Sequence, residues 1–277
     1  MNDRAFSSID CVGQCMLDTE KAHAFQAIIC KIARPEHAVL DVGTGSGILA
    51  LFAAAAGAAK VTALEFDPFV AAIAKENFRN NGYESVIETV IGDARNFKFP
   101  EGARFDVVTM EMLTSGMVDE MQVQAINNLF RQGVVSPATI FIPYRQDTHI
   151  TLAYVDFKVF GFDMKMVIHA WNWLNRIGLS PLSEKMLLNS VDFAQETQDA
   201  FDRVLVMKII ESGVVNAIWL SSRAFVDRTM SLENTCTLNA PVAVPVPDRK
   251  VRAGEEVRVH VRYRFGHGYE NFIVEIL

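Results

Sequence analysis

Two glutamates in the segment VTMEMLTSGMVDEMQ, residues 108–122, have a spacing that could serve chemistry. Glu111 and Glu120 lie nine positions apart, just after an apolar run typical of a buried strand. A lone glutamate is most often a solvated surface charge. If the loop between these two folds into a hairpin, both carboxylates can face one planar cation and bind it bidentately. The spacing therefore raises the hypothesis of a clamp for a cationic group.

A second group of residues follows the ends of consecutive apolar segments. Its members are Asp41, Gly43, Gly45, Gly47, Glu65 and Asp93. The three glycines permit a tight turn and a close approach of the backbone to a ligand. Glu65 ends the next segment, where a carboxylate can accept hydrogen bonds from both hydroxyls of a ribose. Asp93 ends the third, within reach of an adenine amino group, so the pattern predicts a nucleoside-containing cofactor.

The acid before the glycines bears on which cofactor this is. A glycine turn alone is also typical of dinucleotide-binding folds. A carboxylate at Asp41 would repel a pyrophosphate, whereas it would attract the ammonium group of a methionine moiety. The order acid, then G-x-G-x-G, resembles S-adenosylmethionine methyltransferases of the doubly wound class. A dinucleotide-dependent oxidoreductase and a glycine turn that only packs a helix on a strand stay open as alternatives.

The elements around these residues predict an α/β fold. Residues 18–33 have apolar side chains at helical spacing, with Asp18 or Thr19 as the cap. Residues 38–82 alternate strand, glycine turn, helix, strand and helix, and two further strands follow before residue 113. Such alternation is typical of a doubly wound, mostly parallel sheet, as in Rossmann-like folds.

The pattern changes after residue 143 to short stretches of period two separated by turn residues, which favours an antiparallel, β-barrel-like second domain. We therefore predict two domains, residues 1–143 and residues 144–277. A helical arm is expected at about residues 164–188. It carries Trp171, Trp173 and Leu174 close together, more apolar surface than a loop should expose.

Composition narrows the possible partners and location. The formal net charge of the 277 residues is −7 and no run of lysine or arginine occurs, which argues against nucleic acid and mildly favours a cationic substrate. No segment has the length and apolarity of a membrane span or the pattern of a signal peptide, so a cytoplasmic protein is expected. The four cysteines lack metal-ligand spacing, so we predict no metal site and reduced thiols in packing roles.

With these features in place, the sequence resembles the protein arginine N-methyltransferases, whose hallmark is a hairpin loop with two glutamates at this spacing. The likeness begins at MLDTEK and passes through VLDVGTGSGILALFAAAAGA, Glu65 and the glutamate pair. It continues with IFIP at the domain junction, and VFGFDMK is similar to the start of the family's dimerisation arm. VRAGEEVRVHVRYR and YENFIVEI are similar to its last barrel strands.

The resemblance implies a role for each matching residue. Asp41 and the three glycines would hold the methionine part of S-adenosylmethionine, Glu65 the ribose, and Asp93 with Ala94 the adenine. Lys21 would replace the family's arginine for the cofactor carboxylate. Glu111 and Glu120 would hold a guanidinium while one nitrogen attacks the methyl carbon. The implied enzyme is a homodimer that methylates a protein arginine or a small guanidino compound.

Several family features are missing. The N-terminal aromatic motif is absent, and the segment SLENTCTLNAPVAVPVP has neither the histidine nor the tryptophan of the family's Thr-His-Trp loop. The residues between the glutamates lack the family's aromatic side chains. A small-molecule N- or O-methyltransferase on the same fold therefore stays open, as does a non-catalytic module that serves assembly.

Overall fold

The computed structural model describes residues 8–171 and 178–277 of the chain. Its first part contains α1 (Ile9–Leu17), α2 (Thr19–Ile32), β1 (Ala38–Val42), α3 (Ile48–Ala55), β2 (Lys60–Glu65), α4 (Pro68–Asn80), β3 (Ile87–Ile91), β4 (Val107–Met110), the 3-10 helix η1 (Ser115–Met117), α5 (Gln122–Arg131) and β5 (Ile140–Ile142). The five strands form one parallel sheet in the order β3-β2-β1-β4-β5. The predicted Rossmann-like fold is confirmed.

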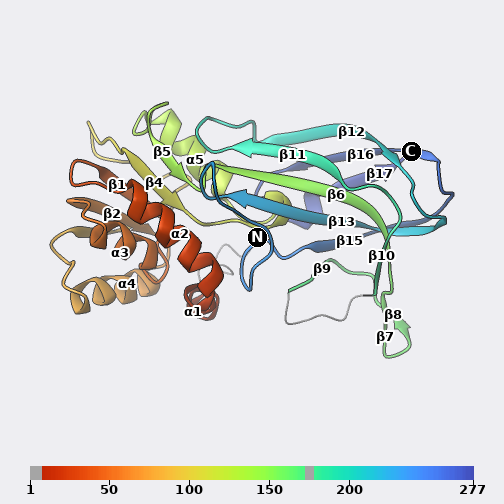
Figure 1. Ribbon diagram of the computed structural model, residues 1–277, viewed down its shortest axis with the longest axis horizontal. Helices are drawn as coiled ribbons and strands as arrows, with labels where there is room; N and C mark the ends of the chain where they lie inside the picture. The colour runs from red at the N-terminus through yellow and green to blue at the C-terminus, as the bar shows by residue number, and fades with distance from the viewer. Residues whose placement is uncertain (1–7, 172–177) are drawn as a thin grey trace.

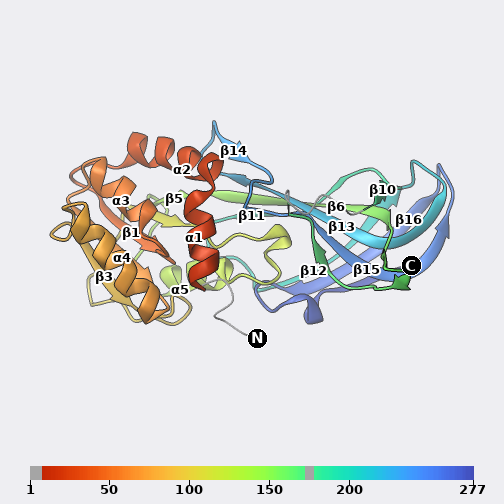
Figure 2. The same ribbon diagram turned by 90° about the horizontal axis from the view of Figure 1, so that it is seen from below.

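Local sequence explains why these elements form where they do. Asp18 is the N-cap of α2 and accepts a hydrogen bond from the backbone N–H of Lys21, as one of the two expected caps. Asp67 caps α4 in the same way, with Pro68 in the first turn. Strands β1, β2 and β4 are almost wholly buried, because helices cover the parallel sheet. Figure 2 shows these helices around the sheet.

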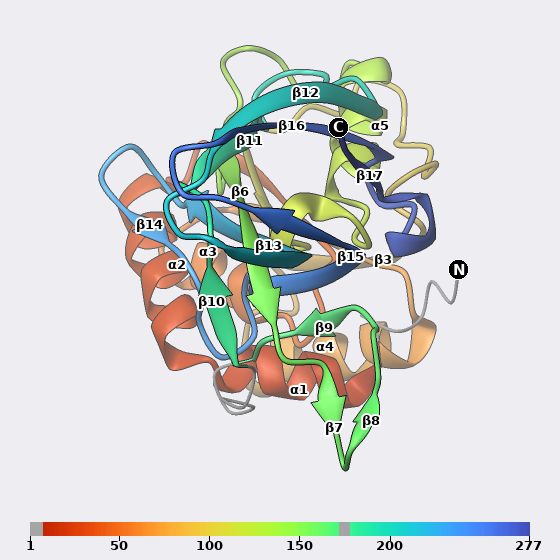
Figure 3. The ribbon, with the colours of Figure 1, turned by 90° about the vertical axis from the view of Figure 1, so that its right-hand side faces the viewer.

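The second part of the chain is antiparallel. Its elements are β6 (Arg145–Val155), β7 (Lys158–Val159), β8 (Phe162–Asp163), β9 (Ile168–His169), β10 (Leu179–Pro181), β11 (Met186–Asp192), β12 (Ala200–Lys208), β13 (Gly213–Phe225), β14 (Ser231–Leu232), β15 (Val242–Val251), β16 (Glu256–Arg264), η3 (Tyr269–Asn271) and β17 (Ile273–Ile276). One sheet runs β10-β6-β13-β15-β9, with β11 on β6 and β14 on β13, and a second runs β12-β16-β17. Figure 3 shows the second sheet lying over the first.

The two parts share one hydrophobic core. Buried side chains of β1 and β4, such as Leu40 and Val108, belong to the same cluster as Ile218 of β13 and Val259 of β16. The parallel sheet and the antiparallel sheets lie end to end along the molecule (Figure 1). The change from parallel to antiparallel pairing falls between β5 and β6, next to residue 143. The division into two domains at that residue stays a prediction.

The helical arm expected at residues 164–188 is wrong for the residues that the structure describes. That segment contains β9, β10 and the start of β11, with no helix in its described part. Ile168 and His169 pair with β15, and the Ala170 N–H donates to the Pro241 carbonyl at 2.7 Å. These backbone hydrogen bonds outweigh the local helical pattern. Trp173 and Leu174 lie outside the described residues.

No helix in residues 8–171 or 178–277 is long and apolar enough to cross a membrane.

Candidate active site

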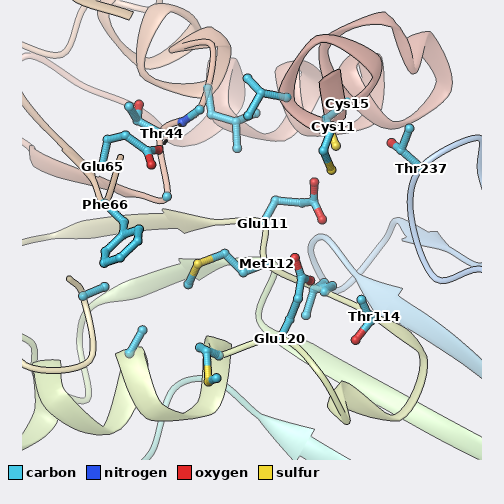
Figure 4. Close-up of a pocket in the computed structure, with 18 of the residues that line it drawn as sticks. Cys11, Cys15, Thr44, Glu65, Phe66, Glu111, Met112, Thr114, Glu120 and Thr237 are labelled. Carbon is cyan, nitrogen blue, oxygen red and sulfur yellow. Dashed lines mark hydrogen bonds between the residues drawn. The ribbon is translucent and has the colours of Figure 1, made fainter. Parts of the chain in front are cut away.

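A cavity of 790 Å³ opens at the carboxyl edge of the parallel sheet. Its wall comes from α1, the loop after β1, the ends of β2, β3 and β4, the loop of residues 111–121, and segments near residues 237 and 269. Figure 4 shows side chains of α1, the loop after β1, the end of β2, the loop of residues 111–121 and Thr237 turned toward one space. Ligands of open α/β sheets bind at this edge, so the fold itself marks the cavity as a candidate site.

Asp41 lies beneath the glycine loop and does not line the cavity. It is buried, and its two carboxylate oxygens accept hydrogen bonds from the hydroxyls of Thr44 at 2.5 Å and Thr109 at 2.7 Å. Burial raises the pKa of Asp41 to about 6, although both hydroxyls act in the opposite direction. In the structure Asp41 fixes the loop and the end of β4, and its direct contact with a methionine moiety stays a prediction.

The glycines of the loop divide in the same way. Gly43 and Gly45 line the cavity, whereas Gly47 does not. Gly47 has φ of 86°, and a Cβ there would lie 2.4 Å from the ring of Phe78. Because only glycine tolerates both the left-handed backbone and this contact, Gly47 is required where α3 begins against Phe78 of α4, and its contact with a cofactor stays a prediction.

Glu65 lies at the end of β2, where it was expected, and faces the cavity (Figure 4). It is buried, and its two oxygens accept hydrogen bonds from the backbone N–H groups of Gly45 at 2.9 Å and Asp67 at 3.0 Å. A carboxylate has about four acceptor positions, so it can still accept from two ligand hydroxyls.

Asp93 and Ala94 line the next part of the wall, after β3. Arg95 holds Asp93, with Nη2 to Oδ2 at 2.7 Å and Nε to Oδ1 at 2.9 Å. Burial alone would raise the pKa of Asp93, but the hydrogen bonds from Arg95 leave it lowered. The carbonyl of Ala94 accepts from Asn128 Nδ2 at 2.8 Å. Both residues are thus held by the protein before any ligand binds.

Glu111 has an unexpected partner. Lys21 Nζ of α2 lies 2.5 Å from Glu111 Oε2, and Lys21 is only 5% exposed. Burial alone would lower the pKa of Lys21, but the charge and hydrogen bond of Glu111 raise it, so the lysine is charged. Both residues line the cavity. One of the two expected clamp carboxylates therefore already faces a cation.

Glu120 lies across from Glu111 in the same cavity, and its carboxylate points toward that of Glu111 (Figure 4). Its side chain makes no hydrogen bond or ion pair to any residue that the structure describes. Burial raises the pKa of Glu120 well above its usual range, and the nearby charges of Glu111 and Asp119 add to this. The loop between the glutamates folds back around η1 and not as a hairpin of paired strands.

The methionines near this loop divide between core and cavity. Met110 and Met117 are fully buried in the core, whereas Met112 and Met121 line the cavity. The sequence left both roles open for them.

The segment that lacks the expected histidine and tryptophan still reaches the site. Asp18 accepts hydrogen bonds from the Thr235 hydroxyl, the Thr237 N–H at 2.8 Å and the Thr237 hydroxyl at 2.9 Å. Cys236 and Thr237 line the cavity. This contact was not predicted from the sequence. The only local feature that pointed to Asp18 was its position as a helix cap.

The cysteines do not have the packing roles that the sequence suggested. Cys11, Cys15 and Cys236 line the cavity, and Cys30 is exposed on α2. None of the four belongs to the hydrophobic core. The short helix α1, which carries Cys11 and Cys15, was not expected as an element of the site.

Comparison with known proteins gives three results. A family model described as ribosomal protein L11 methyltransferase (PrmA) matches residues 23–178. An uncharacterized protein of Methanocaldococcus jannaschii, MJ1452, is 30% identical over 261 residues, which are 94% of this chain and 94% of that protein. Ribosomal protein L11 methyltransferase of Staphylococcus aureus is 36% identical over 125 residues, 45% of this chain and 39% of that protein.

A solved structure shares the fold. The Trypanosoma brucei PRMT1 enzyme–prozyme heterotetrameric complex with AdoHcy matches 89% of this chain and 85% of its own, with a TM-score of 0.72 and 18% identity. Because this likeness covers both the parallel and the antiparallel parts, the whole architecture is one that occurs in a methyltransferase.

Proposed function

The chain belongs to the ribosomal protein L11 methyltransferase (PrmA) family and is an S-adenosylmethionine-dependent methyltransferase, and from this premise we propose that it methylates a guanidino nitrogen. The acceptor would be an arginine in a protein or a small guanidino compound. The observation that supports this most is the pair Glu111 and Glu120 at one cavity, with Glu120 lacking a protein partner among the described residues.

The cavity fits S-adenosylmethionine, which supplies an electrophilic methyl group on its sulfonium. In our proposal Glu65 accepts from the ribose hydroxyls, and the backbone of Gly43 and Gly45 approaches the methionine moiety. Asp93 and Ala94 contact the adenine. Asp41 and Gly47 shape the loop from below. The hydroxyls of Thr44 and Thr109 hold the Asp41 carboxylate, and the ring of Phe78 occupies the space beside the Gly47 Cα.

Lys21 takes the cofactor carboxylate in this proposal. It is the one buried ammonium that lines the cavity in the described part of the chain, and it lies against Glu111. A cation shared between the cofactor carboxylate and Glu111 would hold both in a set position. The cofactor and the clamp would then be aligned by a single side chain.

Glu120 would bind the substrate cation and take its proton. A guanidinium with two nitrogens held by carboxylates leaves its third nitrogen aimed at the methyl carbon, and this alignment supplies much of the catalysis. The methylated nitrogen must lose a proton afterwards. A carboxylate whose pKa is raised is a better acceptor for that proton than an ordinary one.

The test is methyl transfer from methyl-labelled S-adenosylmethionine to free arginine, arginine-containing peptides and a panel of small metabolites, with product mass spectrometry. Glu120→Gln and Glu111→Gln should each lower turnover of the guanidino acceptor by about 100-fold. Glu84→Gln, an exposed glutamate before β3, is the matched control and should not change it. Label on oxygen, with none on any guanidino compound, would refute the assignment.

A second candidate acceptor is an amine or other nucleophile that needs a single carboxylate. The Lys21–Glu111 ion pair favours it, because only Glu120 is then left to face a substrate charge. The Staphylococcus aureus relative acts by its name on a ribosomal protein, L11. This candidate predicts that Glu111→Gln keeps a substantial part of the turnover while Glu120→Gln loses it.

We also propose a homodimer that pairs through the β7–β8 hairpin. The hairpin projects from the sheets (Figure 3) and carries Phe160, which is 96% exposed, with Phe162 and Met164 also exposed. An apolar tip of this kind is typical of an interaction surface. Phe160→Asp should turn a dimer into a monomer in analytical ultracentrifugation, while Ile210→Asp, at another exposed apolar position, should not.

A further inference from the structure

The cysteine pair of α1 lies in the wall of the candidate active site. Cys11 and Cys15 are four positions apart on one helix, so their side chains share a face. Both are half-buried and both line the cavity. Figure 4 shows their sulfurs close together, opposite the Glu111 carboxylate. Neither thiol has a place in the proposed transfer reaction.

The surroundings of Cys15 stabilise its thiolate. The neighbouring Cys11 thiol favours the Cys15 thiolate, and so does the buried ammonium of Lys21. Burial and the charge of Glu111 act the other way, and the balance lowers the pKa of Cys15 to about 7. A thiol in this range has a large thiolate fraction at neutral pH, and the thiolate is the reactive form.

The other cysteines provide the contrast. Cys30 is exposed on α2 and does not line the cavity. The pKa of Cys11 is raised by the neighbouring Cys15 thiol and by burial. Of the two cysteines on α1, Cys15 is therefore the one placed to react.

We propose that Cys15 is the reacting sulfur of a thiol modification site that takes soft electrophiles such as peroxides and, once modified, excludes S-adenosylmethionine from the cavity. With a peroxide, the Cys15 thiolate attacks one oxygen: an S–O bond forms, the O–O bond breaks and hydroxide leaves. Sulfur is oxidised by two electrons to a sulfenic acid and the peroxide is reduced. The added oxygen then lies beside Lys21 and Glu111.

The exclusion part rests on the proposed placement of the cofactor, whereas the reactivity of Cys15 does not. If modification and cofactor binding exclude each other, linkage requires that the cofactor protects the thiol. Two independent readouts follow: the rate at which each cysteine is labelled, and the affinity for S-adenosylmethionine before and after labelling.

The experiment uses iodoacetamide on the full chain, with and without saturating S-adenosylmethionine, and peptide mass spectrometry to follow each cysteine. Cys15 should be alkylated about tenfold faster than Cys30 at neutral pH. S-adenosylmethionine should slow alkylation of Cys15 by about tenfold and leave Cys30 unchanged. Cys11→Ala should slow the labelling of Cys15 by about fivefold, because the polar side chain beside its sulfur is removed. Hydrogen peroxide with dimedone should give an adduct on Cys15.

Calorimetry then tests exclusion. Alkylated Cys236→Ser protein, in which the exposed thiol of the cavity wall is removed, should bind S-adenosylmethionine about tenfold more weakly than the same protein untreated. The double variant Cys15→Ser/Cys236→Ser should show the same affinity with and without treatment. Circular dichroism confirms that each protein is folded. Cys15 reacting no faster than Cys30, or a modified protein that binds as tightly as before, overturns the inference. If untreated protein binds no cofactor, the proposed cofactor site is refuted. The labelling rates still test whether Cys15 is more reactive than Cys30.

Discussion

The carboxylates at the edge of the parallel sheet and those in the loop of residues 111–120 differ in their protein partners. At the edge of the parallel sheet, Asp41, Glu65 and Asp93 each have both oxygens hydrogen-bonded by the protein. In the loop of residues 111–120, Glu120 has no partner in the part of the chain that the structure describes. A carboxylate with partners is held in place before a ligand arrives, whereas a buried one without partners gains most from an incoming cation. Carboxylates that have protein partners therefore shape the site, whereas a carboxylate without them is available to a ligand.

Glu111 differs from both groups because its partner is a charged side chain, Lys21. Removing one member of this ion pair should have the largest effect on the free energy of unfolding. Lys21→Met leaves a nearly buried carboxylate without its cation, which should lower the free energy of unfolding by about 3–5 kcal/mol. Urea denaturation measures this. Adding Glu111→Gln should restore most of the loss. A loss below about 1 kcal/mol in the single variant would mean that the pair behaves as a surface ion pair.

Asp41 should make stability depend on pH. Its pKa is 3.8 when unperturbed and about 6 in the folded protein, so the folded state binds the proton more tightly between these values. Stability should therefore fall as pH rises through this window. Relative to wild type, Asp41→Asn should gain about 2 kcal/mol between pH 4 and pH 6, since most of the shift of roughly two pKa units falls in this window. Urea midpoints at both pH values check this, and a constant difference would contradict it.

Asp18 should show the opposite pH dependence with a smaller effect. Burial alone would raise the pKa of Asp18, but hydrogen bonds from Thr235 and Thr237 leave it lowered. Its stabilisation is therefore present above the usual carboxyl range and is lost as pH falls through the folded pKa. Asp18→Ala should cost about 2 kcal/mol at neutral pH, because a helix cap and the contacts to Thr235 and Thr237 are lost. Asp10→Ala, on exposed α1, is the control and should cost little.

The variants Glu120→Gln and Glu65→Gln have the smallest expected effects on stability, and they compare the loop of residues 111–120 with the sheet edge most directly. Glu120→Gln removes a charge that burial disfavours, so stability should stay the same or rise by about 1 kcal/mol at neutral pH. Glu65→Gln turns an amide N–H toward a backbone N–H and should cost about 2 kcal/mol. Thermal or urea unfolding of the two variants compares them. Equal losses would contradict the contrast between a satisfied and an unsatisfied carboxylate.

Local patterns predicted much of the fold. The alternation up to residue 113 matches β1 to β4 with α2, α3 and α4, and the period-two stretches match β6, β12, β13, β16 and β17. The wrong element, the arm at residues 164–188, is one whose conformation depends on pairing with a distant strand, β15. That strand contains Pro245 and was not expected either. Edge pairing is a long-range property that no local window contains.

For the site, the amino-acid sequence by itself determined which residues end the strands of a parallel sheet, since residue type and period encode that. It therefore placed Glu65, Asp93 and Glu111 at one edge. Only the tertiary structure decided what each carboxylate meets there. Lys21 and Glu111 are 90 positions apart, and Asp18 and Thr235 are 217 apart. Hydrogen bonds and charges act over a few ångströms of space, and the folded chain alone determines which distant residues come that close.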